Sequence, residues 1–170
     1  MPVRISGYAC RLPGARNVNE FWRVLADQRC TVTSIPDARF ESRRFRHPDR
    51  ETRGTSVTFA AGVIDGVFDF DAPFFGISPR EAVQMDPQQR LVLQVVWEAL
   101  ESAGVAPSSL AGQEVGVFVG ASSFDYLYRF INDPAICDTQ MMTGNTLSII
   151  ANRISYQFDL RGPSLTIDTA

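Results

Sequence analysis

Few side chains in this sequence are of the types that enzymes use as nucleophiles or as acid–base groups. Its 170 residues contain three cysteines, Cys10, Cys30 and Cys137, and one histidine, His47. All 16 basic residues are arginines, which excludes lysine Schiff bases and a P-loop lysine within this sequence. His47 stands among arginines, where we expect a solvated surface residue rather than a general base. The cysteines are widely spaced and odd in count, which argues against a disulfide framework or a zinc site. We expect them to be small buried thiols.

Glu81 and Asp86 are close enough in sequence to suggest a pair of carboxylates for acid–base work. A structural reading explains both residues equally well. Glu81 is the third residue after Ser78, and both Ser78 and Asp86 are followed directly by proline. Serine or aspartate before proline is typical of a helix N-terminus. We therefore interpret Glu81 and Asp86 as residues of two helix starts, without a chemical role.

Composition excludes several classes of partner. The chain is 45% hydrophobic and 21% charged, as in soluble globular proteins, with a net charge of −3. That charge gives no general attraction to nucleic acid. No apolar run approaches the roughly 20 residues of a membrane helix, and the N-terminus lacks the apolar core of a signal peptide. We predict a cytoplasmic protein with neither nucleic acid nor membrane as partner.

Periodicity and chain breakers predict the elements that must position any site. In the first part we expect a strand over 3–9, with Gly7 allowing close packing, a helix over 18–28 that begins with Asn17 and Glu20, an exposed loop over 36–56 and a short strand over 57–63. An irregular stretch over 67–75, dense in aromatic residues, should be anchored in the core by its rings.

The second part is predicted to alternate helices and strands. We expect a short helix from Pro79 and a long, largely apolar helix from Pro87 to about Ala103, ended by Gly104. A strand over 115–120, buried on both faces, and a helical stretch over 124–132 should follow. A helix over 146–158, capped by Thr143 or Asn145, and a strand from 164 onward complete the prediction. This alternation indicates the α/β class, with helices on both faces of a parallel or mixed sheet.

Several runs closely resemble the ketosynthase (beta-ketoacyl synthase) domain of modular type I polyketide synthases. They span the whole chain in the family's order and spacing. The runs are Ala9-Cys10-Arg11-Leu12-Pro13-Gly14, Phe74-Phe75-Gly76-Ile77-Ser78-Pro79-Arg80-Glu81-Ala82, Met85-Asp86-Pro87-Gln88-Gln89-Arg90-Leu91, Trp97-Glu98-Ala99-Leu100-Glu101, Gly116-Val117-Phe118-Val119-Gly120, Gly144-Asn145-Thr146-Leu147-Ser148, Asn152-Arg153-Ile154-Ser155-Tyr156 and Leu160-Arg161-Gly162-Pro163-Ser164.

The resemblance implies a fold and a reaction. The fold is the thiolase-like fold of αβαβα layers, of which residues 1–170 would be the N-terminal half only. The enzyme is a homodimeric acyltransferase that condenses a carrier-bound acyl chain with a malonyl-type extender and releases carbon dioxide. It binds no cofactor directly, since the phosphopantetheine arm is delivered by an acyl carrier protein. Adjacent domains such as an acyltransferase are further expected partners.

The resemblance also implies where the site residues lie. Asp168, Thr169 and Ala170 match the active-site strand, which the family continues at once with the nucleophilic cysteine. The family's two catalytic histidines lie further downstream. Met141, Met142 and Thr143 match the region of the acyl pocket and the dimer seam. We therefore expect no catalytic residue within this sequence, a front portion of a larger domain, and no condensing activity from residues 1–170 alone.

Alternatives remain open at this point. The protein could be a non-catalytic, ketosynthase-like partner of the chain-length-factor type, a fatty acid or thiolase-like condensing enzyme, or a pure binding module. The exposed loop over 36–56 also has two interpretations: it is either a solvated face or a docking site for an acidic carrier protein. Its six arginines are Arg39, Arg43, Arg44, Arg46, Arg50 and Arg53.

Overall fold

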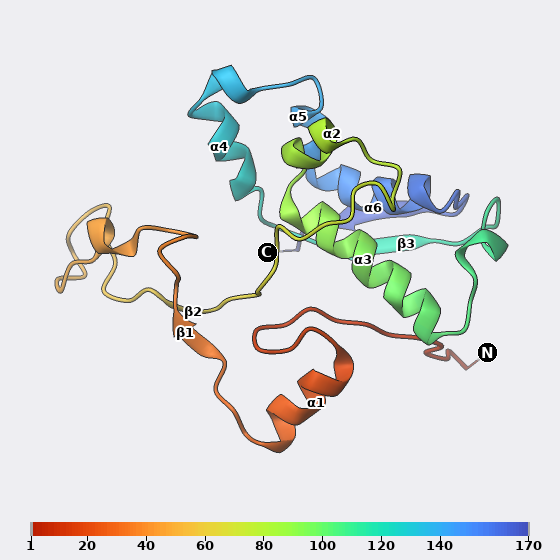
Figure 1. Cartoon of the computed structure of the whole chain (residues 1–170), viewed down its shortest axis with the longest axis horizontal. Helices are drawn as coiled ribbons and strands as arrows, with labels where there is room; N and C mark the ends of the chain where they lie inside the picture. The colour runs from red at the N-terminus through yellow and green to blue at the C-terminus, as the bar shows by residue number, and fades with distance from the viewer. Residues whose placement is uncertain (1, 170) are drawn as a thin grey trace. The chain divides into compact units, whose positions relative to one another are not determined.

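The computed structural model describes residues 2–169 (for Pro134, the backbone alone). They form two compact units. The small unit comprises residues 10–66. The large unit comprises residues 67–169 together with residues 2–9. Figure 1 shows the elements of each unit, and the units are described separately below.

Helix α1 (Val18–Ala26) of the small unit confirms the predicted helix and its start. The side chain of Asn17 accepts the backbone N–H of Glu20 at 2.9 Å. The Glu20 carboxylate in turn accepts the backbone N–H of Arg16 at 2.8 Å, one residue earlier than a capping box requires. The helix ends two residues before the predicted boundary, and Gln28 then adopts a left-handed conformation with φ of 52°.

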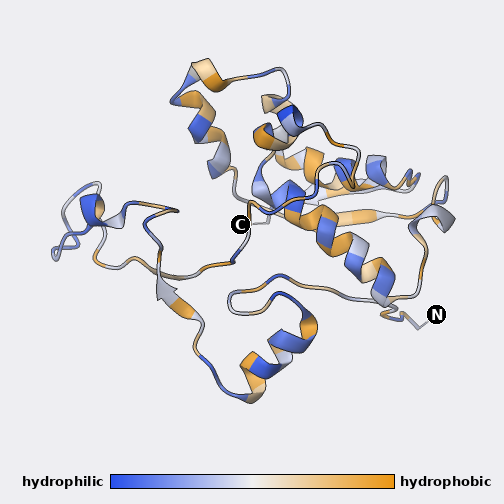
Figure 2. Cartoon of the chain, viewed as in Figure 1, coloured by the Kyte–Doolittle hydropathy of each residue, from blue (hydrophilic) through white to orange (hydrophobic). Residues whose placement is uncertain are grey.

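The rest of the small unit is a two-stranded ribbon with a long excursion. Strand β1 (Val32–Ser34) pairs antiparallel with β2 (Ala60–Gly62), and Val32 lies opposite Gly62. The residue pattern does not predict β1, and the strand predicted over 57–63 is longer than β2. Between them lies the predicted exposed loop, which contains the single 3-10 turn η1 (Ser42–Phe45) and is largely hydrophilic (Figure 2). Phe40 anchors this loop by stacking on Phe45 and Phe59.

Two helix starts in the large unit are confirmed. Helix α2 (Pro79–Gln84) begins where the Ser78 hydroxyl accepts the backbone N–H of Glu81 at 3.1 Å. Helix α3 (Pro87–Ser102) begins where Asp86 accepts the backbone N–H of Gln88 at 2.8 Å. Gly104 follows α3 with a φ of 67°, which suits glycine at a helix C-terminus.

The large unit contains a parallel sheet, as predicted. Strand β3 (Val117–Gly120) pairs with β4 (Ser164–Ile167), with Val117 opposite Ser164 and Gly120 opposite Ile167. Helix α6 (Leu147–Gln157) packs on one face of this pair, where Ser155 of α6 donates a hydrogen bond to Ser164 at 3.0 Å. Strand β3 stands out as hydrophobic in Figure 2.

The prediction that β3 is buried on both faces is wrong within the described residues. Phe118 is 64% exposed, whereas Val117 on the other face is buried. Leu165 and Ile167 of β4 share the exposed face, at 49% and 47%. Helix α6 contacts both strands, and Val117 joins Ile154 of α6 in the core, whereas Phe118, Leu165 and Ile167 lie on the opposite face.

Two further expectations about local structure are wrong. Thr143 and Asn145 do not cap α6, because both lie inside α5 (Met141–Asn145), and Thr146 occupies the cap position. Residues 3–9 form no strand, because no other strand of the described chain pairs with them. The close packing expected of Gly7 is confirmed, since a Cβ there would lie 2.2 Å from the Ala99 carbonyl oxygen of α3.

Short turns connect β3 to α5. They comprise η3 (Asp125–Leu127) and α4 (Tyr128–Ile131), which confirm the helical stretch over 124–132, and then η4 (Pro134–Ile136). Turn η2 (Pro107–Ser109) lies between α3 and β3. Across residues 2–169, none of the helices has the length and apolar character needed to cross a membrane.

The core of the large unit lies between α3, α6 and the sheet. Leu93 of α3 and Ala151 of α6 have no exposed surface. The aromatic stretch over 67–75 is irregular, as predicted, and contributes Phe75, which stacks on Phe70. The remaining buried members of this core are Ala72, Ile77, Met85, Val117, Ile154 and Phe158.

Candidate functional site

The carboxyl ends of β3 and β4 form the candidate active-site edge, because both parallel strands end there. The backbone N–H of Ala121 donates to the Ile167 carbonyl at 3.2 Å and extends the pairing past the last residue of β3. A hollow of about 260 Å³ lies at this edge. It is lined by Gly120, Ala121, Ser122, Ile167, Asp168 and Thr169.

Asp168 and Thr169, which were expected on the active-site strand, therefore lie at this hollow. Both are exposed and follow directly after β4. Ala170 lies outside the described residues. In open α/β sheets, ligands bind beyond the carboxyl ends of the strands. The residues that follow β4 can therefore contact a ligand bound in the hollow.

The imidazole of His47 has a backbone partner, and the three thiols differ in exposure. His47 of the small unit is half-buried, and its Nδ1 accepts the backbone N–H of Asp49 at 3.2 Å. Cys30 and Cys137 are exposed, which contradicts the expectation of buried thiols, and Cys10 is half-buried. Within residues 2–169, no group of three or more His, Cys, Asp or Glu side chains is arranged to hold a metal ion.

The predicted acyl-pocket residues lie on α5, where Met142 is 62% exposed and Thr143 is also exposed. A larger apolar cavity of about 450 Å³ lies elsewhere, between α3, β3 and α6. Its walls include Val96, Phe118 and Phe158, but neither Met141, Met142 nor Thr143. Contact of α5 with an acyl chain therefore stays a prediction.

A buried polar cluster beside α5 was missed by the sequence analysis. Gln84, Gln89 and Asn145 are 7%, 1% and 5% exposed. Gln89 lies four residues before the fully buried Leu93, so helical spacing could have indicated that it faces the core. Arg153 of α6 donates to the Gln89 side-chain oxygen at 2.7 Å and to the Glu81 carboxylate at 2.6 Å.

Burial shifts the pKa values of two charged residues around this cluster, Asp86 and Arg90. Burial raises the pKa of Asp86 above its ordinary value, although the Gln88 backbone N–H bond opposes the shift. Burial also lowers the pKa of Arg90, whose guanidinium lies over the rings of Phe68 and Tyr126. These shifts follow from desolvation and do not create an acid–base pair.

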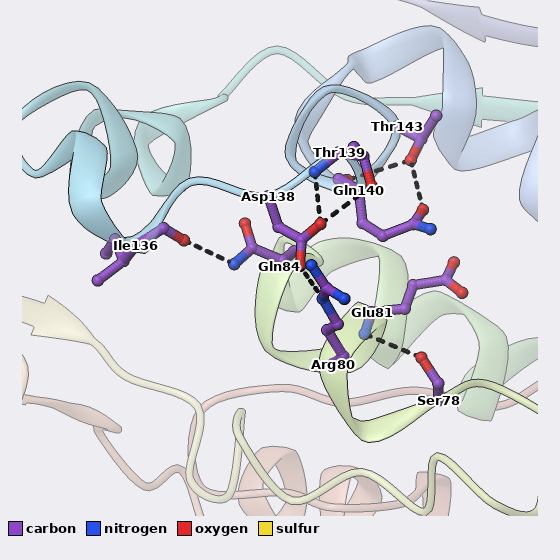
Figure 3. A network of polar contacts seen from close by, with 9 residues as sticks. All are labelled: Ser78, Arg80, Glu81, Gln84, Ile136, Asp138, Thr139, Gln140 and Thr143. Atoms are coloured by element: carbon purple, nitrogen blue, oxygen red, sulfur yellow. Dashed lines mark hydrogen bonds and ion pairs between the residues drawn. The ribbon is translucent and has the colours of Figure 1, made fainter.

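Asp138 lies at the edge of the cluster, with its side chain 9% exposed. A hydrogen bond from the Arg80 side chain lowers its pKa, and Thr139 contributes further hydrogen bonds. Figure 3 shows Arg80 of α2 reaching the Asp138 carboxylate, while Gln84 points toward the Ile136 carbonyl. The ion pair thus connects α2 to the chain that leads into α5.

The family model described as "Beta-ketoacyl synthase, N-terminal domain" matches residues 1–170. The chain belongs to this family. Polyketide synthase GfsE of Streptomyces halstedii is 43% identical over 99% of this chain and 4% of its own length. Pikromycin polyketide synthase component PikAII of Streptomyces venezuelae is also 43% identical, over 99% of this chain and 5% of its own length.

Solved ketosynthase structures share the fold. The oxazolomycin ketosynthase domain OzmH KS7 from Streptomyces albus JA3453 superposes with a TM-score of 0.89 at 38% identity, over 97% of this chain and 29% of its own. The ketosynthase from module 6 of the bacillaene synthase of Bacillus subtilis 168 gives 0.81 at 34% identity, over 97% and 26%. The chain therefore has the N-terminal half of the thiolase-like fold, and it spans a small part of its relatives' length.

Proposed function

We propose that this chain is the N-terminal portion of a ketosynthase domain in a modular polyketide synthase. The whole domain would extend a carrier-bound acyl chain by decarboxylative Claisen condensation. The observation that carries the proposal is the open hollow at the carboxyl ends of β3 and β4, where Asp168 and Thr169 follow β4. In the family, the residues that follow this position include the nucleophilic cysteine.

The reaction consists of two transfers. In the first, the cysteine thiolate attacks the acyl thioester, so that a new C–S bond forms and the carrier's pantetheine thiolate leaves. In the second, a malonyl-type thioester loses carbon dioxide, and the carbanion that remains attacks the acyl-enzyme carbonyl. A C–C bond forms, the enzyme C–S bond breaks and the cysteine thiolate is restored. Histidines further along the family's sequence would stabilise the developing oxyanion.

The residues of this chain position the reaction rather than perform it. The parallel pairing of β3 with β4 fixes the chain direction at the hollow, and α6 holds β4 in place through Ser155 and Ser164. A thiolate at the start of a following helix would have a lowered pKa and therefore attack readily at neutral pH.

Partners follow from the same proposal. We propose a homodimer that receives both substrates on the phosphopantetheine arm of acyl carrier proteins, beside domains such as an acyltransferase. Arg43 and Arg44 fit the docking of an acidic carrier, since both side chains are largely exposed, at 85% and 71%. Nearby acids already contact them, as Arg43 lies 3.5 Å from Asp37 and Arg44 lies 2.9 Å from Glu41.

The condensation assay uses the full-length protein with an acyl thioester and a malonyl-type thioester. We expect a 3-oxoacyl product together with one equivalent of carbon dioxide. Failure to form the product with any acyl donor would favour the non-catalytic relative. Reversal of charge in Arg43→Glu/Arg44→Glu tests the docking site: acylation from a carrier protein should weaken while acylation from a small thioester persists. Equal rates from the carrier would refute docking there.

A further inference from the structure

Residues 136–145, here called the amide-held segment, are fixed by polar contacts more than by apolar packing. Met142 is 62% exposed and Ile136 is 38% exposed, so hydrophobic burial holds little of the segment in place. Three buried carboxamide side chains instead connect it to α2 and α3. Gln84 Nε2 donates to the Ile136 carbonyl at 2.9 Å and Gln89 Nε2 to the Thr143 carbonyl at 3.0 Å, while Asn145 Nδ2 of the segment donates to the Gln84 carbonyl at 2.9 Å.

The orientation of Gln89 is set from the opposite side. Arg153 can only donate hydrogen bonds, so the Gln89 oxygen must face its Nε at 2.7 Å. This turns the Gln89 amide nitrogen toward the Thr143 carbonyl. Arg153 is itself fixed by Glu81, 2.6 Å away, with the two side chains only 11% and 24% exposed. A chain of contacts therefore leads from α6 through α3 to the amide-held segment.

Close backbone packing completes the attachment. The backbone N–H of Asp86 donates to the Gly144 carbonyl at 2.8 Å. A Cβ at Gly144 would lie 2.4 Å from the Gln84 carbonyl oxygen, so only glycine fits against the end of α2. At the other end, Arg80 contacts Asp138 (Figure 3). The segment is thus held at several points, while the side chain of Met142 remains exposed and can contact a ligand.

We infer that Gln84, Gln89 and Asn145 are positioning residues that set which acyl chains the enzyme accepts. The inference rests on the proposed function and on the resemblance that matches Met141, Met142 and Thr143 to the region of the acyl pocket. A wall whose backbone is fixed by buried hydrogen bonds excludes chains of the wrong length. If the hydrogen bonds of Gln84, Gln89 or Asn145 are lost, the wall becomes more mobile, and acyl chains of different length are accepted more equally.

The test compares two carboxamide-to-methionine variants of the full-length protein. Gln84→Met removes the donor to Ile136, and it also removes a buried amide oxygen that has no hydrogen-bond partner, so the fold should tolerate it. Gln94→Met is the matched control, because Gln94 donates to the Asp69 carbonyl at 3.3 Å, outside the amide-held segment. The readout is kcat/KM for acetyl, butyryl and hexanoyl thioesters, expressed as the ratio of the best of the three substrates to the poorest.

We expect Gln84→Met to shift this ratio roughly fivefold toward unity and Gln94→Met to leave it unchanged. Asp138→Asn, which loosens the segment through Arg80, should shift the ratio in the same direction and serves if Gln84→Met does not fold. An active wild-type protein whose ratio is unchanged in both variants overturns the inference alone. A wild-type protein without acyl transfer overturns the proposed function and the selectivity role with it.

Discussion

Gly144→Ala should destabilise the contact between α5 and α2, although helix propensity alone favours alanine. Gly144 lies within α5, where alanine is preferred over glycine by about 1 kcal/mol. The added Cβ, however, would lie 2.4 Å from the Gln84 carbonyl oxygen, 2.9 Å from its carbonyl carbon and 3.1 Å from Met85 Cα. All three are backbone atoms, which cannot swing aside as a side chain can.

The magnitude follows from these two opposing effects. Overpacking of a tight contact costs about 1–3 kcal/mol, and a rigid backbone neighbour places this site near 3 kcal/mol. Subtraction of the propensity gain leaves a loss of about 2 kcal/mol. Since each 1.4 kcal/mol is a factor of ten, local opening of the amide-held segment should become about 30-fold more frequent.

Hydrogen exchange read by mass spectrometry measures this opening in the full-length protein. Peptides over 136–145 and 79–91 should exchange faster in Gly144→Ala, whereas peptides of the small unit should not change. Gly120→Ala is the control, since a Cβ at Gly120 would meet no atom within 4 Å. Unchanged or slower exchange over 136–145 in Gly144→Ala would refute the reasoning, because propensity would then outweigh the contact.

Three further predictions concern other contacts. Arg153→Met leaves the half-buried Glu81 carboxylate unpaired and should cost about 2 kcal/mol, measured by urea unfolding, and Glu81→Gln in the same protein should recover part of the loss. Because Arg80 lowers the pKa of Asp138 below its ordinary 3.8, the stability that Asp138 contributes is present above pH 3.8 and is lost as the pH falls through the lowered pKa. The difference in urea midpoint between wild type and Asp138→Asn should therefore shrink as the pH falls below 3.8. A difference that stays constant would contradict the ion pair. Asn17→Ala should cost α1 about 1 kcal/mol, seen as faster exchange in α1 and not in the large unit.

Local signals in the sequence predicted the helix starts correctly. Ser78 and Asp86 cap α2 and α3 through bonds to residues two or three positions ahead, and Asn17 does the same for α1. These bonds depend on neighbours in the chain, so a single sequence contains what is needed. The parallel strand β3 was likewise predictable from its apolar run between glycines.

Features that depend on distant partners were not predictable in this way. Residues 3–9 have the apolar pattern of a strand, but a strand requires a neighbour, and none of the described strands pairs with them. Strand β1 is only three residues long and is defined by β2, some 28 residues away. The predicted caps Thr143 and Asn145 failed because both lie inside α5, where Asn145 donates hydrogen bonds to the Gln84 and Met141 carbonyls.

The candidate site was predicted in part. The resemblance placed Asp168 and Thr169 on the active-site strand, and the structure puts both at the hollow beyond β3 and β4. Gln84, Gln89 and Arg153 were missed as a cluster, because hydrogen bonds across more than 50 residues leave no mark in local spacing. Only Gln89 had a local signal, because it lies four residues before the buried Leu93 on α3.

The most direct measurement is a peptide map of the full-length protein after incubation with an acyl thioester. Cleavage after Arg161 releases the peptide that starts at Gly162 and contains β4, Asp168 and Thr169. The account predicts that the acyl mass appears on a cysteine of this peptide, beyond Thr169. Acylation at Cys10, Cys30 or Cys137, or no stable acylation at all, would contradict the claim that β4 delivers the nucleophile.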